Sequence, residues 1–251
     1  GDEPPIAEAL TATDLRPLKW LTETYQQFGA DLSPIYTTCA DYIKNQMLKR
    51  TQDFPEAKKD DKNKPKEGES KAKAPKTDIF AAVGQLMNLT IKLSKPYSLI
   101  FTSKEATNAL NRSIKLAWND ERFNIVMSFN DYIDSLVKDE FKSSEHSLDD
   151  QCQIISRFYG YLADKAKFNV YYESSFVRRL IKMRSKVSQY DYPIINTIRK
   201  ISTDFMLRLD EFNKQFNDSE QLKDEFKRYV ADDPSYNKVS VEPFVFNFLT
   251  F

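Results

Sequence analysis

Few side chains in this sequence could carry out chemistry, and those few do not converge. The one histidine, His146, lies in a turn rich in Ser and Glu with no second His or Cys nearby. A metal site or a histidine-based catalytic pair needs further ligands or partners, so we interpret His146 as a surface residue. There is also no phosphate-binding Gly-rich loop, no Ser nucleophile between glycines and no Cys pair at zinc spacing. We therefore predict a non-enzymatic protein without a catalytic residue, cofactor or metal site.

The acidic pairs and the two cysteines also favour structural roles. Asp60 and Asp61 are adjacent, as are Asp149 and Asp150, so each pair would project in different directions from a helix. Acid and base catalysis needs converging carboxylates instead. Cys39 and Cys152 each lie inside an apolar helical pattern, which predicts buried free thiols in a reducing, intracellular compartment rather than a disulfide.

One basic cluster could bind phosphate or nucleic acid. An alternative is that its side chains follow the edge of a core and pair with acids on neighbouring helices. We favour that alternative because the chain has 37 basic and 37 acidic residues, and therefore no net charge to attract nucleic acid or an anionic membrane. The cluster consists of Arg178, Arg179, Lys182, Arg184 and Lys186.

The composition predicts an all-α protein. Only five glycines serve 251 residues, and 41% of the residues are hydrophobic, which suits long helices with a sizeable core. No apolar run approaches the ~18 residues of a membrane span, and the first residues lack the pattern of a signal peptide. We expect a soluble nuclear or cytoplasmic protein. Because it opens without Met and stops inside an apolar run, we expect a piece of a longer chain.

Apolar residues recur three to four apart through most of the chain, which predicts a series of one-sided helices. Between residues 53 and 76 the composition changes to Lys, Glu, Asp and Pro, which predicts a disordered insertion. Five helices are expected around it. The first runs from Leu15 to Phe28 with Gly29 as C-cap, and the second begins at Ser33 as N-cap. The third begins at Thr77 or Asp78, and Pro96 should kink or end it; the fourth begins with a capping box at Thr102 to Glu105, and the fifth runs from Phe123 to Leu136.

The second half of the chain predicts four more helices and a strand. Ser147 and Asp150 resemble a capping box, and Phe168, Tyr172, Phe176 and Leu180 fall four apart as a core-facing seam. The remaining patterns predict one helix from Ile194 through Phe212, a short one from Asp218 or Ser219 to Tyr229, and a strand containing Val239, Val241, Phe244, Phe246 and Phe248. A lone strand needs partners elsewhere, so Phe244, Phe246 and Phe248 are the candidate partner-binding residues.

The stretch from Phe168 to Ile181, FNVYYESSFVRRLI, resembles the cullin family. In that family a Phe, a Tyr four residues later and an apolar, basic and Leu-rich run form one helix of a central four-helix bundle. Similar matches in the same order occur at Tyr42 to Asn45, Tyr132 to Leu136, Ile194 to Ile201, Phe205 to Phe212, Ser219 to Phe226 and Phe246 to Thr250. The Cys-Gly usual in the family is absent at Ser202 to Asp204, so the chain resembles a divergent member.

The resemblance implies an elongated stack of helical bundles. Residues 1–140 would form a five-helix cullin repeat, residues 141–235 the four-helix bundle, and residues 236–251 the first strand of an α/β domain. It also implies a rigid scaffold segment of a cullin-RING ubiquitin ligase, binding a RING-box protein and a substrate adaptor mostly through regions outside this chain. Neither a small-molecule substrate nor a membrane is implied. A helical-rod subunit of a vesicle-tethering complex and a nucleic-acid-binding helical protein remain as alternatives.

Overall fold

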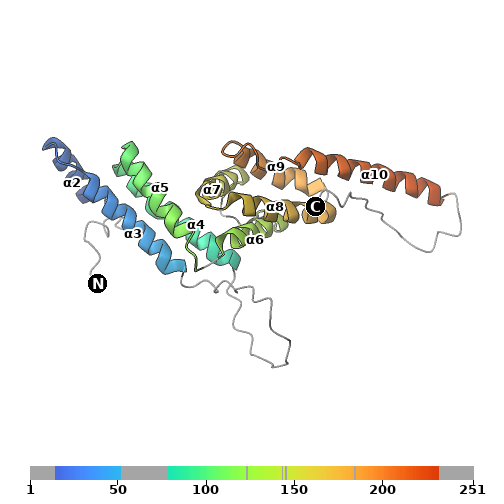
Figure 1. Ribbon diagram of the computed structural model, residues 1–251, viewed down its shortest axis with the longest axis horizontal. Helices are drawn as coiled ribbons and strands as arrows, with labels where there is room; N and C mark the ends of the chain where they lie inside the picture. The colour runs from blue at the N-terminus through green and yellow to red at the C-terminus, as the bar shows by residue number, and fades with distance from the viewer. Residues whose placement is uncertain are drawn as a thin grey trace, which may run out of the picture. The chain divides into compact units, whose positions relative to one another are not determined.

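The computed structural model describes residues 15–51, 79–122, 124–142, 144, 146–183 and 185–231. In these residues all the regular structure is helical, with nine helices and no strand (Figure 1). The predicted all-α class is confirmed for this part of the chain. The predicted insertion at 53–76 and the strand within 236–251, with Phe244, Phe246 and Phe248, lie outside the described residues.

The chain divides into two compact units. The first unit comprises Gly1–Ser135 and Arg157–Lys165, and the second comprises Leu136–Ser156 and Ala166–Phe251. The division falls at three points: inside α6 (Ile125–Lys138), inside α7 (Leu148–Tyr161) and after the first residue of α8 (Lys165–Met183). The chain therefore passes from one unit to the other within continuous helical backbone.

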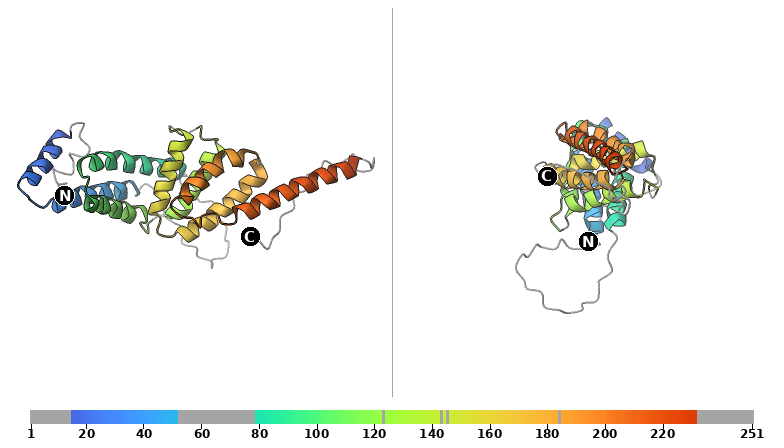
Figure 2. Two further views of the ribbon diagram at one scale, coloured as in Figure 1. Left: turned by 90° about the horizontal axis from the view of Figure 1, so that it is seen from above. Right: turned by 90° about the vertical axis from the view of Figure 1, so that its right-hand side faces the viewer.

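The first unit is built on four further helices, α2 (Arg16–Gln27), α3 (Ser33–Thr51), α4 (Ile79–Ile100) and α5 (Lys104–Trp118). Helix α3 packs mainly against α5 and also against α4, while α2 contacts α4 (Figure 2). Cys39, Ile43 and Ile114 are completely buried in the core of this unit. Burial of these one-sided stripes, more than helix propensity, holds such helices together.

Buried aromatic residues pack against one another in the core of the first unit. The indole of Trp118 lies 4.7 Å from the ring of Phe158 and 5.6 Å from that of Phe129, between ring centroids. The hydroxyl of the buried Tyr97 donates to the carbonyl oxygens of Ala106, at 2.9 Å, and Tyr36, at 3.2 Å. Tyrosine is tolerated there because its hydroxyl has partners.

The helix ends show which local predictions were correct. Gly29 follows α2 with φ 65°, the left-handed conformation that glycine adopts without strain. Helix α5 begins after Ser103, whose hydroxyl accepts from the Ala106 N–H at 3.1 Å, so the N-cap lies one residue later than a Thr102 to Glu105 box would place it. At α3 the acceptor is Asp31, which bonds the N–H of Ser33 at 2.8 Å, and Ser33 itself is the first helical residue.

Two predictions about the first unit need correction. Of the two outcomes expected at Pro96, a kink or the end of the helix, the second is wrong, because α4 continues to Ile100. The residue after the proline, Tyr97, is buried and donates to the Ala106 carbonyl oxygen. The apolar stripe assigned to the first helix is also shorter than predicted. Leu18 is buried, but Tyr25 and Phe28 are exposed, since the core ends before the last turn of α2.

The second unit contains α8 (Lys165–Met183), α9 (Ser185–Arg199) and α10 (Leu209–Ala231). The single helix predicted from Ile194 through Phe212 is wrong, because the chain turns between residues 200 and 208. The Arg199 guanidinium holds this turn by donating to the carbonyl oxygens of Phe205, at 2.9 Å, and Met206. Met206 has φ 53°, which breaks the helix even though its side chain is buried.

The short separate helix predicted from Asp218 or Ser219 is also wrong, because α10 runs without interruption from Leu209 to Ala231. Ser219 lies seven residues after Phe212, on the same helix face, and is itself buried. A small hydroxyl fits inside a helical seam as well as at a cap, so a Ser after Asn and Asp is an ambiguous start signal.

Candidate functional site

The predicted aromatic seam of α8 forms the core of the second unit. Phe168, Tyr172 and Phe176 are completely inaccessible, and Leu180 is almost so. The Phe205 ring lies 5.1 Å from the Tyr172 ring and 6.3 Å from the Phe168 ring, between centroids. The four-residue spacing is thus confirmed as a core seam, which the turn after α9 covers.

A buried polar cluster joins α8 to α9 beside this seam. Arg179 and Asp191 are 1% and 0% exposed, and the guanidinium donates from Nη2 to Oδ1 at 2.6 Å and from Nε to Oδ2 at 3.1 Å. The Tyr172 hydroxyl donates to the same Oδ1 at 2.8 Å, and the Arg179 guanidinium carbon lies 5.3 Å from the centre of the Tyr172 ring. The carboxylate therefore receives three hydrogen bonds, two of them bidentate and charge-assisted.

Burial in this cluster raises the pKa of the Tyr172 hydroxyl well above its ordinary value, and the Asp191 charge raises it further. A neutral tyrosine that donates to a carboxylate cannot act as a base near neutral pH. The arrangement is a closed ion pair with its hydrogen-bonding groups satisfied inside the protein. Its consequence is a fixed register between α8 and α9.

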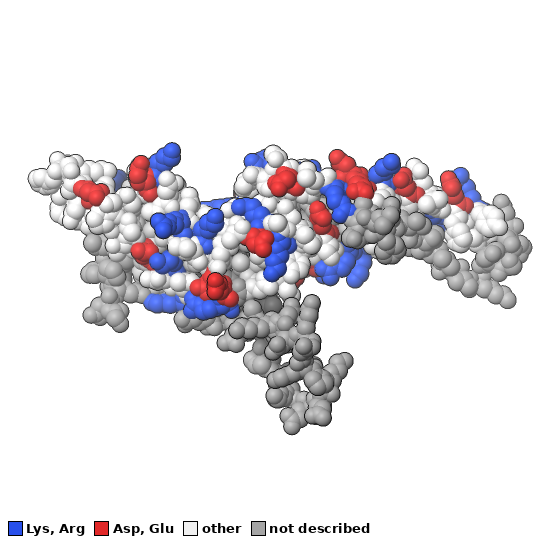
Figure 3. All heavy atoms as spheres, in the orientation of Figure 1, with Lys and Arg blue, Asp and Glu red and all other residues white. Residues whose placement is uncertain are grey.

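The basic cluster predicted around this point does not form one surface. Arg179 points into the core and pairs with Asp191 on the neighbouring helix, as the favoured interpretation predicted. Arg178 and Lys182 are exposed, and Arg178 Nη2 donates to the Ser175 hydroxyl at 2.9 Å. The side chains of Arg184 and Lys186 lie outside the described residues. On the face in Figure 3, basic and acidic groups are interspersed over the described residues.

The single histidine lies on the surface, as predicted. His146 is exposed, and its backbone N–H donates to the Ser144 hydroxyl at 3.1 Å. Next to it, Ser147 and Asp150 meet at the start of α7, as predicted: the Ser147 hydroxyl accepts from the Asp150 N–H at 3.2 Å and donates to the Asp150 carboxylate at 2.8 Å. These groups cap a helix, and within the described ranges no cluster of three His, Cys, Asp or Glu could hold a metal ion.

Both cysteines are buried and free, as predicted. Burial raises the pKa of each thiol to about 12. The thiolate is the nucleophile and the metal ligand, so a raised pKa makes both side chains unreactive at physiological pH. They function as small apolar residues of the core.

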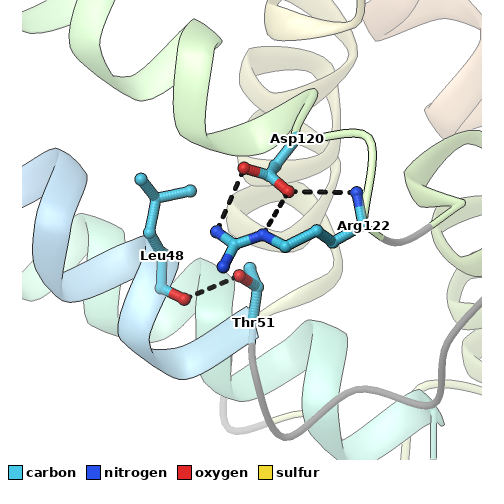
Figure 4. Close-up of polar contacts among 4 residues, drawn as sticks. All are labelled: Leu48, Thr51, Asp120 and Arg122. Atoms are coloured by element: carbon cyan, nitrogen blue, oxygen red, sulfur yellow. Dashed lines mark hydrogen bonds and ion pairs between the residues drawn. The ribbon is translucent and has the colours of Figure 1, made fainter.

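A local ion pair lies in the turn after α5, between Asp120 and Arg122. Asp120 accepts from Arg122 Nε at 2.7 Å, from its Nη2 at 3.1 Å and from its backbone N–H at 3.0 Å, next to the end of α3 at Leu48 and Thr51 (Figure 4). The hydrogen bond from Arg122 lowers the pKa of the Asp120 carboxyl. Arg122 is exposed and Asp120 is partly exposed, and an ion pair at such a position contributes little to stability.

The sequence did not predict two exposed aromatic residues at α2 and its C-cap. Trp20 on α2 is 66% exposed, and Phe28, the C-cap residue that follows α2, is 82% exposed. The sequence signal that could have predicted an exposed Trp20 is its position outside the apolar stripe of the helix. Asp191 was also missed, although it lies three residues before Ile194 and seven before Ile198, which places an acidic residue on the apolar face.

No helix in the ranges that the structure describes is long and apolar enough to cross a membrane. The comparison with curated proteins gives no significant match. A family model described as the cullin alpha solenoid domain matches residues 2–223, which is most of the sequence and includes both compact units in large part. The all-helical structure agrees with that description. The chain therefore belongs to the cullin family.

Proposed function

We propose that this chain is a rigid, non-catalytic scaffold segment of a cullin-RING ubiquitin ligase. The observation that supports this proposal most strongly is the family match over residues 2–223. The chemistry of the described residues agrees with it, because the cysteines are buried with raised pKa values and the buried Arg179 is paired with Asp191. The segment would link the end that carries the substrate receptor to the end that carries the RING protein and its ubiquitin-conjugating enzyme.

Rigidity would itself be the function of such a segment. A fixed separation between substrate and loaded enzyme raises the effective concentration of one near the other, and a flexible link lowers it. The helix-through-helix connection of the two units favours this role. We propose an elongated stack, with residues 1–140 as a cullin repeat, 141–235 as the four-helix bundle and 236–251 as the start of an α/β domain.

The partners under this proposal are a RING-box protein and a substrate adaptor, in the nucleus or the cytoplasm. Most of their contacts would lie outside this chain. Phe244, Phe246 and Phe248 are proposed to support the RING-bearing end, through the strand that their alternation predicts.

Co-purification tests the proposal directly. The full-length protein is tagged in cells, and its stoichiometric partners are identified by mass spectrometry. A RING protein among them supports the scaffold proposal. Recovery of long helical-rod subunits without a RING protein would contradict the proposal and favour a tethering complex. Recovery of nucleic acid whose binding weakens steeply with salt would contradict it and favour a nucleic-acid-binding protein.

A substitution tests the proposed role of the C-terminal phenylalanines. Phe246→Ala should reduce the recovered RING protein several-fold. Leu222→Ala is a matched control, because Leu222 is an apolar residue exposed on α10. Equal recovery with Phe246→Ala and the parent would contradict this role without affecting the family assignment.

A further inference from the structure

The turn between α9 and α10, residues 200–208, combines exposed apolar residues with a buried anchor. Ile201 and Leu207 are 53% and 70% exposed, whereas Phe205 is completely buried. The Phe205 ring lies 5.1 Å from the Tyr172 ring in the aromatic seam of α8, between centroids. The turn therefore packs on the core of the second unit at one point and presents apolar side chains to solvent at others.

Two side chains of this region, Arg199 and Ser202, hold the turn in its shape. Arg199 Nε donates to the Phe205 carbonyl oxygen at 2.9 Å, and Arg199 Nη2 donates to the Met206 carbonyl oxygen. The hydroxyl of the half-buried Ser202 donates to the exposed Asp204 carboxylate. This hydrogen bond lowers the pKa of Asp204, so the carboxylate is charged at neutral pH. Side-chain hydrogen bonds, and not a regular helix, therefore fix the turn.

The sequence at this turn has the charge pattern of a phosphorylation site. Arg199 and Lys200 stand three and two positions before Ser202, and no other Ser or Thr in the sequence has basic residues at both places. Protein kinases that select such sites bind the two basic side chains in an acidic cleft. Lys200 is exposed, and Ser202 lies outside the helices. Only the turn and the end of α9 therefore have to open for a kinase to bind this stretch in extended form.

We propose that Ser202 is a phosphoacceptor for a kinase that selects basic residues, and that its phosphorylation releases the turn. The γ-phosphoryl group of ATP forms a bond to the Ser202 oxygen, ADP leaves, and the hydroxyl proton passes to the carboxylate base of the kinase. The modified oxygen no longer donates to Asp204, and a phosphate with a charge of about −1.5 to −2 faces that carboxylate. Its oxygens also compete with the Phe205 and Met206 carbonyls for the Arg199 guanidinium.

Phosphorylation of the folded protein tests the acceptor. The full-length protein is incubated with ATP and a cyclic-AMP-dependent protein kinase, and phosphopeptides are quantified by mass spectrometry. Ser202 should be phosphorylated, and Lys200→Ala should reduce its phosphorylation several-fold, whereas Thr203→Ala should leave it unchanged. Ser98 is an internal comparison, because it is exposed and follows Lys95 by three residues but lies inside α4. No phosphate at Ser202, equal phosphate at Ser98, or equal losses in the two variants would overturn the proposal.

Amide hydrogen exchange tests the release of the turn. Exchange at residues 200–208 should be faster in the phosphorylated protein than in the unmodified one, while exchange in α5 of the first unit stays the same. Ser202→Ala removes the hydroxyl without adding charge, so it should accelerate exchange less than phosphorylation does. Unchanged exchange after phosphorylation, or an equal increase with Ser202→Ala, would overturn the release by phosphate. Neither measurement needs a RING protein, so their failure is distinct from failure of the scaffold function.

Discussion

At the scale of single residues, the second unit holds a charged pair, Arg179 and Asp191, inside its core. A buried ion pair adds little compared with apolar residues of the same volume, yet removing one partner leaves an uncompensated charge in the core. The Tyr172 hydroxyl increases this dependence, because it also relies on Asp191 as its acceptor. The pair therefore specifies the α8–α9 register more than it adds stability.

Arg179→Met should lower the free energy of unfolding by about 3–5 kcal/mol, because Asp191 would remain buried without its partner. Arg178→Met is the matched control at the neighbouring exposed position, and it should stay within about 0.5 kcal/mol. Urea denaturation followed by circular dichroism measures both variants. Equal losses of unfolding free energy in the two variants would contradict the claim that Asp191 depends on Arg179 in the core.

The raised thiol pKa values predict a loss of stability in alkali. Each thiol has a pKa of about 12 in the folded protein and about 9 when unfolded, so above pH 9 only the unfolded state releases the proton. Stability is fully present below pH 9 and falls as the pH rises towards 12, by at most about 1.4 kcal/mol per pH unit for each thiol.

Urea midpoints measured between pH 8 and 10.5 test this loss. The double variant with Cys39→Ala and Cys152→Ala should show a shallower decline than the parent over this range. Parallel declines in the two proteins would show that the thiols do not carry the effect. The buried Tyr172 contributes a decline of the same sign above its ordinary pKa, in both proteins alike.

At the scale of the elements, capping side chains decide where several helices begin. Ser103 bonds the N–H of Ala106 at the start of α5. Ser103→Ala should lower the free energy of unfolding by about 1 kcal/mol, the usual value of an N-cap. Ser98→Ala, at an exposed position inside α4, is the control and should be neutral or slightly stabilising, because Ala is the better helix former. Thermal or urea unfolding compares the pair, and an equal loss in both would contradict the cap.

Sequence reasoning found most helices because their stripes match the helical period over long stretches. Phe168, Tyr172 and Phe176 were identified as core residues from spacing alone. It failed where tertiary contacts override a local signal. Ile201 continues the stripe of α9, yet it is exposed in a turn that Arg199 and the left-handed Met206 define.

The polar contacts between helices could not be predicted in the same way. Asn119 and Tyr161 are far apart in sequence and neither has a distinctive neighbourhood, so only the packing of α7 on α5 brings them together. Arg179 and Asp191 are closer along the chain, and an acidic residue on an apolar stripe was a usable signal for their pair. The exposed residues of α2 depend on where the core ends, which periodicity does not encode.

At the scale of the whole molecule, the chain is a member of the cullin family, and the proposed function is that of a scaffold. Under that proposal rigidity matters within an assembly that holds a substrate at one end and a loaded enzyme at the other.

Ubiquitin transfer in a reconstituted assembly tests the proposed scaffold function most directly. The full-length protein is combined with a RING protein recovered with it, a loaded ubiquitin-conjugating enzyme and an adaptor-bound substrate, and transfer to the substrate is measured. We predict that transfer requires this protein and the RING protein together. Transfer that proceeds with this protein in the absence of any RING protein, or that is unaffected by omitting this protein, would contradict the scaffold function.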